Sequence, residues 1–192
     1  MKKIAISGAG GFLGSYILEK SINRGLDEIV VITSNLKSIK ATDLSDKVIA
    51  IDTQDFLRDG FKFGSETVFI NCLFPTNADG SKMADGLTKN FGMILKAKES
   101  GADAIINVSS QSVYDQKRTC AAKESDKPCT DSMYAVGKYC SEMYCNEVFK
   151  DICHTNIRLA SLIGVGYDQR IANRLIIQAL KGEQIIAIHK II

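Results

Sequence analysis

The sequence has few of the residue patterns that hold metals or structural disulfides. None of its six cysteines forms a C-x-x-C pair, and there are only two histidines, His154 and His189. Zinc sites are built from closely spaced sets of such residues, and thiol-disulfide enzymes use the C-x-x-C pair. We therefore expect no metal site, no disulfide framework and no dithiol chemistry, but the free thiols of a cytoplasmic protein.

The chain also lacks an excess of one charge and a long apolar run. Its net charge of +2 gives no electrostatic footprint for nucleic acid or for an anionic membrane. No apolar run approaches the roughly 20 residues of a membrane span. With 45% hydrophobic and 24% charged residues, the 192-residue chain suits one domain, or one domain and part of a second. We expect it to bind neither nucleic acid nor a membrane.

Short apolar segments alternate with amphipathic ones along most of the chain. This pattern predicts six strands, over residues 3–7, 28–33, 48–51, 67–72, 104–108 and 155–159. It predicts four helices, over residues 12–24, 84–100, 133–150 and 169–181. Continuous apolar strands separated by helices indicate a parallel sheet with helices on both faces, and right-handed crossovers make it doubly wound.

A glycine cluster follows the first predicted strand. Gly8, Gly11 and Gly14 have the spacing G-x-x-G-x-x-G, whereas the common G-x-G-x-x-G fingerprint would require glycine where Leu13 stands. Such a loop lets the backbone approach a pyrophosphate, which the N–H groups at the helix start then bind. The loop predicts a dinucleotide site on a Rossmann-like α/β fold. An ordinary strand-to-helix turn is the alternative for the loop taken alone.

Two polar motifs follow the fifth predicted strand. Tyr134 and Lys138 are four residues apart, so they share one face of the helix over 133–150. A tyrosine titrates near pH ~10 unperturbed, and a neighbouring ammonium favours its phenolate, so the pair suits proton transfer. Ser110 ends the strand, where it can hydrogen-bond a substrate oxygen, and the polar loop over 111–132 is a candidate site edge. An exposed helix pair and a serine-rich turn are the alternatives.

The order of these motifs carries a family resemblance. Residues 7–14 read S-G-A-G-G-F-L-G and residues 109–114 read S-S-Q-S-V-Y, while residues 124–138 end in Y-A-V-G-K and residues 157–159 read I-R-L. They resemble, in turn, the T-G-x-x-G-F-[IL]-G, S-S-x-x-V-Y, E-x-x-x-P…Y-x-x-x-K and I-L-R-P segments of extended short-chain dehydrogenase/reductases. This is the NAD(P)-dependent epimerase/dehydratase group, which acts largely on nucleotide sugars, and the resemblance covers nearly the whole chain.

The resemblance implies a role for each candidate residue. Tyr134 is expected to be the general acid/base, Lys138 to bind the nicotinamide ribose and tune Tyr134, and Ser110 to hold the reacting oxygen. Asp52 is expected to reach the adenine. Cofactor contacts are expected at Gly8, Gly11, Phe12, Leu13, Gly14, Thr33, Asp52, Asn71, Tyr134 and Lys138.

The end of the second strand bears on the choice of cofactor. Residues 32–35 read I-T-S-N, without the acidic residue that binds the ribose 2′-hydroxyl of NAD in many such sites. Lys37 and Lys40 lie close by in the sequence. We therefore expect NAD or NADP, with a slight preference for NADP.

The chain ends soon after the sixth strand, where the family usually continues into a small substrate domain. We expect a dinucleotide-binding domain over residues 1–161 and the start of a mostly missing substrate region over residues 162–192. The apolar segment 185–188 suggests a strand that needs a neighbour, so we expect a shortened chain or a partner subunit that covers it. The resemblance also raises a homodimer that pairs the helix over 84–100 with the helix of Tyr134.

Two functions from different classes fit these features. The first is an NAD(P)-dependent epimerase, dehydratase or ketoreductase that acts on a nucleotide sugar by hydride transfer. The second is an NAD(P)-binding sensor or scaffold protein on the same fold, without catalysis. The joint presence of Ser110, Tyr134 and Lys138 favours the enzyme, because a sensor has no use for proton transfer.

Overall fold

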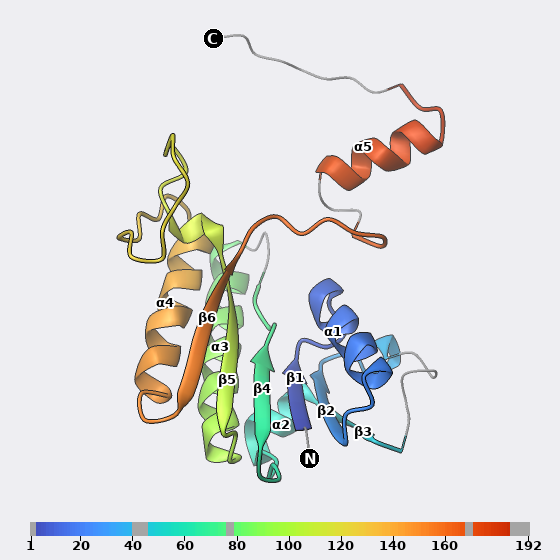
Figure 1. Ribbon diagram of the computed structural model, residues 1–192, viewed down its shortest axis with the longest axis vertical. Coiled ribbons are helices and arrows are strands. Elements are labelled where there is room, and N and C mark those ends of the chain that lie inside the picture. The colour runs from blue at the N-terminus through green and yellow to red at the C-terminus, as the bar shows by residue number, and fades with distance from the viewer. Residues whose placement is uncertain (1–2, 40–45, 76–78, 168–170, 185–192) are drawn as a thin grey trace. The chain divides into compact units, whose positions relative to one another are not determined.

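The computed structural model describes residues 3–39, 46–75, 79–167 and 171–184 (Figure 1). The chain divides into two compact units, Met1–Ala160 and Ser161–Ile192. The second unit contains the helix α5 (Ile171–Leu180), and its Asn173 amide donates to the carbonyl oxygens of Gly164 and Tyr167. Lys40 and the predicted strand over 185–188 lie outside the described residues.

The first unit is built on a six-stranded sheet in the order β3-β2-β1-β4-β5-β6, with every neighbouring pair parallel. The strands are β1 (Lys3–Ser7), β2 (Glu28–Thr33), β3 (Val48–Asp52), β4 (Thr67–Asn71), β5 (Ala104–Ser110) and β6 (Cys153–Leu159). The order reverses between β1 and β4, which is the doubly wound arrangement. The predicted Rossmann-like α/β fold is therefore confirmed.

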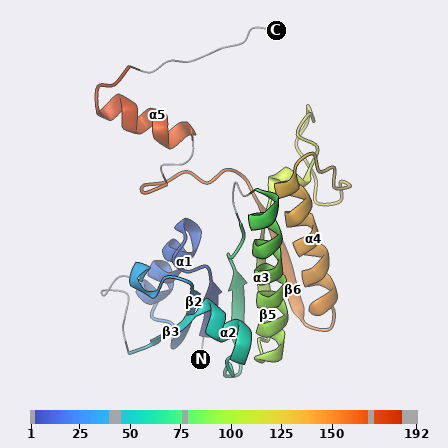
Figure 2. The ribbon, with the colours of Figure 1, turned by 180° about the vertical axis from the view of Figure 1, so that it is seen from behind.

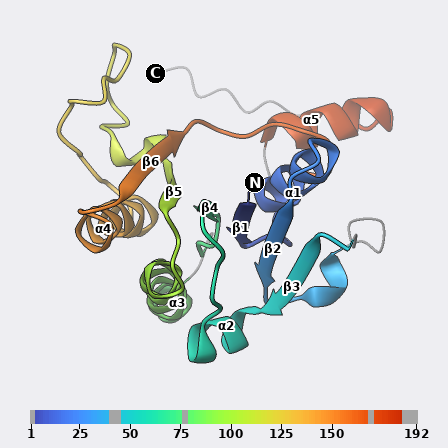
Figure 3. The same cartoon turned by 60° about the horizontal axis from the view of Figure 1, so that its bottom comes forward.

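Four helices cover the sheet. They are α1 (Phe12–Asn23), α2 (Thr53–Asp59), α3 (Gly80–Glu99) and α4 (Met133–Val148). Figure 3 shows α1 on one face of the sheet and α2, α3 and α4 on the other, and Figure 2 shows these three from behind. Because successive strand residues point to opposite faces, β1 and β2 contribute side chains to two cores.

The two cores differ in size. The core on the α1 face is small and gathers Ile6, Ile29 and Val31 around Leu18. The core on the other face is larger, because three helices bring their apolar side chains to it. Its buried residues include Val30, Ile32, Phe56, Phe69, Met93, Ile94, Ile105, Cys145 and Phe149.

Side-chain caps set where the helices begin, and they explain where the structure departs from the pattern. Asp79 Oδ1 accepts from the Lys82 N–H at 2.9 Å, so α3 begins four residues before the predicted start. Asp52 caps α2, a helix that the pattern did not predict because its seven residues include only two apolar ones. Ser132 caps α4, and two short 3-10 helices follow β2 (Leu36–Ser38) and β5 (Gln111–Val113).

Candidate active site

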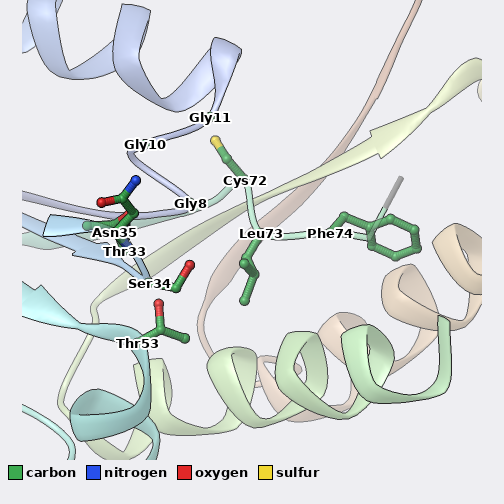
Figure 4. Close-up of a pocket in the computed structure, with 10 residues that line it drawn as sticks. All are labelled: Gly8, Gly10, Gly11, Thr33, Ser34, Asn35, Thr53, Cys72, Leu73 and Phe74. Carbon is green, nitrogen blue, oxygen red and sulfur yellow. Dashed lines mark hydrogen bonds between the residues drawn. The ribbon is translucent and has the colours of Figure 1, made fainter. Parts of the chain in front are cut away.

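The carboxyl ends of the parallel strands form one edge of the sheet, and a pocket of about 310 Å³ opens there (Figure 4). In doubly wound sheets this edge, at the strands where the order reverses, is the usual place for a ligand. The pocket is lined by Gly8, Gly10, Gly11, Thr33, Ser34, Asn35, Thr53, Cys72, Leu73 and Phe74.

The glycine loop forms one wall of this pocket, and its spacing has steric causes. Gly8 has a φ of +68°, and a Cβ on it would lie 3.1 Å from the backbone carbon of Cys72. A Cβ on Gly14 would lie 2.3 Å from the carbonyl oxygen of Gly8, so only glycine lets α1 pack this closely. Gly11, the N-cap of α1, has no side chain to occupy the N–H groups of the first turn. The start of α1 therefore has the form of a helix N-terminus that binds an anion.

Phe12 and Leu13 form the first turn of α1 but do not line the pocket. The ring of Phe12 packs against Tyr16 at 5.1 Å between centroids, and Leu13 is half-buried. Their contribution to the loop is therefore the backbone of the helix start.

Thr33, Asp52 and Asn71, the polar residues at three strand ends, are placed differently from one another. Thr33 lines the pocket, and its Oγ1 accepts from the Asn35 N–H at 3.2 Å. Asp52 does not line it, because its carboxylate accepts from the Gln54 N–H at 2.7 Å to cap α2. Asn71 is buried and hydrogen-bonded within the protein. The structure therefore brings Thr33 to the pocket with the glycines.

Thr53, which the sequence reasoning did not single out, supplies an unusual polar atom to the same wall. Its side chain is 2% exposed, and its Oγ1 has no hydrogen-bond partner among the described residues. A buried hydroxyl without a partner costs free energy, so such groups call for an explanation. Its position on a pocket wall opposite the glycine loop suits a polar ligand atom. The only signal in the sequence is its place directly after a strand end.

Tyr134 and Lys138 lie together on α4, as their spacing predicted. Lys138 is 4% exposed, and its Nζ donates to the Val108 carbonyl oxygen at 2.7 Å. The same Nζ lies 5.9 Å from the centroid of the Tyr134 ring. The Phe74 ring contacts both residues, with its centroid 3.9 Å from Nζ and 5.4 Å from the Tyr134 centroid.

Burial changes the pKa of Lys138 and of the neighbouring Cys72 thiol. It lowers the pKa of Lys138 to about 8, although the proximity of Cys72 and Glu142 opposes the change. Burial also raises the pKa of the Cys72 thiol to about 12. At neutral pH Lys138 is therefore charged, and Cys72 is a neutral thiol that serves as part of the pocket wall.

Two successive serines at the end of β5 make different contacts. Ser110 is 9% exposed, and its Oγ accepts from the Ser112 N–H at 3.2 Å and lies 3.1 Å from the Ser112 hydroxyl. Ser109 donates to the Glu142 carboxylate, which forms a 2.7 Å ion pair with Arg158. Ser109 therefore links β5 to Glu142 of α4, whereas the Ser110 side chain bonds locally, to Ser112, at the carboxyl end of β5.

A row of polar side chains crosses the sheet just below the pocket. Ser7, Asn71, Asn107 and Asn156 occupy paired positions on β1, β4, β5 and β6. Each is hydrogen-bonded to the next, at 2.7, 3.0 and 2.8 Å between the bonded side-chain atoms. This row was not predicted from the sequence, where only one asparagine in each of three strands indicates it.

The row also reaches the helices and the pocket wall. Asn107 donates to the Ser141 hydroxyl of α4 at 3.4 Å, and Ser141 donates to Asn90 of α3 at 2.7 Å. Asn90 in turn donates to the Leu73 carbonyl oxygen at 2.7 Å. The end of β1, the α4 helix of Lys138 and the pocket wall therefore belong to one hydrogen-bonded network.

Within the described ranges, no three His, Cys, Asp or Glu side chains gather into a group that could hold a metal ion. All six cysteines are free thiols. Among the helices that the structure describes, none is both long enough and apolar enough to cross a membrane.

Comparisons with known proteins agree with the fold. The chain is 27% identical over 143 residues to ADP-L-glycero-D-manno-heptose-6-epimerase from Thiobacillus denitrificans, a match that covers 70% of this chain and 42% of that one. Its fold matches UDP-glucuronic acid 4-epimerase from Bacillus cereus in complex with NAD, with a TM-score of 0.77 and 21% identity, over 94% of this chain and 64% of that one. It also matches the Bordetella bronchiseptica enzyme WbmG in complex with NAD, with a TM-score of 0.78 and 18% identity, over 95% and 61%.

The chain thus spans less than two thirds of the length of these relatives. The family model that describes NAD dependent epimerases and dehydratases matches residues 4–190. This match includes the glycine loop, the end of β5 and the α4 helix with Tyr134 and Lys138. The chain therefore belongs to the NAD dependent epimerase/dehydratase family.

Proposed function

We propose that the protein is a nicotinamide-dependent oxidoreductase of the epimerase/dehydratase type that acts on a nucleotide sugar. The observation that carries the proposal is the pairing of Tyr134 with the buried, charged Lys138 beside the glycine pocket. Family membership supports it. So do the names of relatives, which include a heptose 6-epimerase and a UDP-sugar 4-epimerase.

The pocket suits the adenosine diphosphate half of a dinucleotide. The first-turn N–H groups of α1 and the close approach at Gly8 suit a pyrophosphate. The unpartnered Thr53 hydroxyl, with Thr33 and Asn35, gives the adenosine half polar contacts. When bound, the nicotinamide would accept and return a hydride.

We propose NAD as the first cofactor to test. The expected preference for NADP rests on the missing acidic residue after β2, whereas the names of two matched structures include NAD.

The chain's own residues would move the proton. We assign to Tyr134 the transfer of a proton to or from a sugar hydroxyl. Lys138, fixed by the Val108 carbonyl, would hold positive charge beside the Tyr134 ring and so stabilise the phenolate. Ser110, at the end of β5, would hydrogen-bond the reacting oxygen.

A Tyr134→Phe variant tests this assignment. Because general acid–base groups contribute about 100- to 10,000-fold, we expect turnover to fall by that factor while NADH affinity stays unchanged. Products from NAD and a panel of nucleotide sugars would be identified by mass. Tyr139→Phe, in the same helix, is the matched control and should keep its turnover.

Equal turnover in Tyr134→Phe and wild type would contradict the role of the tyrosine. If NAD binds but no sugar of the panel is converted, the sensor or scaffold function becomes the better description.

We also propose that the protein forms a homodimer through α3 and α4. Met133, Val136 and Met143 are exposed along one face of α4, and Leu95 is exposed on α3. Apolar side chains arranged in this way suit burial against the same helices of a second copy. A solution mass measured by light scattering would test the dimer, and a monomer at high concentration would contradict it.

A further inference from the structure

Phe74 separates the glycine pocket from the residues proposed to do the chemistry. Its ring lines the pocket, whereas neither Tyr134 nor Lys138 does. In the close-up, the ring lies on the far side of the pocket from Thr33 and Thr53, next to the helices (Figure 4). The pocket therefore ends at Phe74, and Tyr134 and Lys138 lie behind its ring.

The ring is held in this position from several sides. It packs edge-on against the Tyr134 ring, with 89° between the two planes. A Cβ on Gly137 would lie 3.2 Å from the Phe74 Cζ, so the absent side chain of this glycine leaves room for the ring on α4. The Lys138 ammonium, 3.9 Å from the ring centroid, adds a cation–π attraction that is strong because the ammonium is buried.

These contacts leave Lys138 poorly accessible from the pocket. Nζ donates in one direction to the Val108 carbonyl oxygen, and the face of Phe74 covers it in another. A ribose hydroxyl that arrived through the glycine pocket would meet the ring before it met the ammonium.

We infer that Phe74 is a gate: its ring closes the passage from the glycine pocket to Lys138 and must rotate away before the nicotinamide half of a dinucleotide reaches Lys138. The inference rests on the proposed function. The adenosine diphosphate half binds at the glycine loop and Thr53 wall, where Phe74 does not intervene. The gate therefore lowers affinity for the nicotinamide half alone, in proportion to the fraction of molecules with the gate open.

A fixed stacking platform at Phe74 would change the NADH affinity in the opposite direction. If Phe74 were a fixed platform on which the nicotinamide stacks, removal of its ring would weaken NADH binding and leave ADP binding unchanged. A gate that is open in about a tenth of the molecules makes NADH bind about tenfold more tightly once the ring is gone.

The test compares ADP and NADH binding to the full chain of wild type, Phe74→Ala and Leu73→Ala. NADH binding is followed by the fluorescence of the reduced nicotinamide, and ADP affinity is obtained by competition. We expect Phe74→Ala to bind NADH about tenfold more tightly and ADP within twofold of wild type. Leu73→Ala, which shortens the neighbouring residue of the pocket wall, should change the affinities for both ligands equally.

A second readout needs no cofactor. In the ligand-free protein, an amine acetylating reagent should modify Lys138 several-fold faster in Phe74→Ala than in wild type, as measured by peptide mass. Lys82, exposed on α3, is the internal reference in both proteins. A far-UV melting curve shows that the variant is folded.

The outcomes separate the gate from the proposed function. If ADP and NADH bind but Phe74→Ala leaves their ratio unchanged or weakens NADH binding, the gate is wrong and the proposed function stands. Unchanged acetylation of Lys138 also overturns the gate. If folded protein of every variant binds neither nucleotide, both the proposed function and the gate fall.

Discussion

Replacing Lys138 by methionine should stabilise the protein at neutral pH, because the buried ammonium opposes folding. Burial lowers the pKa of Lys138 from 10.5 to about 8. The difference of about 2.5 (10.5 − 8) in pKa corresponds to about 3.5 kcal/mol at ~1.4 kcal/mol per pKa unit. The loss of the charge-assisted hydrogen bond to the Val108 carbonyl returns about 2 kcal/mol. A methionine sulfur replaces the cation–π contact with Phe74 by a sulfur–aromatic contact. We therefore expect a net gain of about 1.5 kcal/mol at pH 7.

The pH dependence has a definite sign. Below pH 8 the lysine is protonated in both states, and the full cost of burying its charge is present. Between pH 8 and 10.5 the unfolded chain binds a proton that the folded protein has lost, so the free energy of unfolding rises with pH. The advantage of Lys138→Met should therefore shrink across this window and reverse near its upper end, where the cost of burying the charge is gone and the lost hydrogen bond remains.

Urea unfolding followed by far-UV circular dichroism, from pH 7 to 10.5 in reducing buffer, measures this difference. Burial raises the pKa of both Cys72 and Cys145 to about 12, so their ionisation on unfolding destabilises wild type and variant alike. Only the difference between the two proteins is used. Lys82→Met, which removes an exposed charge, is the control. A stability difference that stays constant between pH 8 and 10.5 would refute the reasoning.

Two further predictions use matched pairs. Gly14→Ala should lower the melting temperature by several degrees and weaken ADP binding, because its Cβ would lie 2.3 Å from the Gly8 carbonyl oxygen, whereas Gly80→Ala has open space and should change neither. Asn107→Leu should lower the free energy of urea unfolding by about 2–4 kcal/mol, because the buried Asn71 Nδ2 loses its acceptor and the half-buried Asn156 Oδ1 loses its donor. Asn146 of α4 accepts a hydrogen bond from Asn156 at an exposed position, so Asn146→Leu should cost about 1 kcal/mol or less. Equal losses within either pair would contradict the argument.

The inner strands β1, β2, β4 and β5 could be predicted from the sequence because they are largely buried, whereas the edge strands β3 and β6 are more exposed. Buried strands are near-continuous apolar runs. All six strands, including the mostly polar β6, were predicted to within two residues of their observed bounds. The helix α2 was missed because one and a half turns with Phe56 and Leu57 as its apolar residues give no helical period. Caps such as Asp79 are single polar residues whose effect depends on the backbone conformation that follows.

The motifs of the candidate site could be predicted, but its contacts could not. The spacing of Tyr134 and Lys138 fixes their common face, since four residues bring side chains together on any helix. The ring of Phe74 over Lys138 depends on how β4 meets α4, and on Gly137 leaving space for it. Whether Asp52 faces a ligand or caps a helix is likewise decided by the chain that follows it.

The polar row across the sheet has a consequence for assembly as well as for the site. A shift of β5 by one residue against β4 would place Ile106 or Val108 opposite Asn71 and turn the Asn107 amide to the other face. Each wrong alignment therefore leaves buried amides unpaired, while the correct one pairs all of them. The strands that carry the polar row are distant in the sequence, so their pairing during folding is slow. Their apolar runs alone would allow several pairings of similar energy. The amides thus select the correct register of the sheet. Strands of similar apolar composition differ by one polar position in each, and only the correct register pairs these positions.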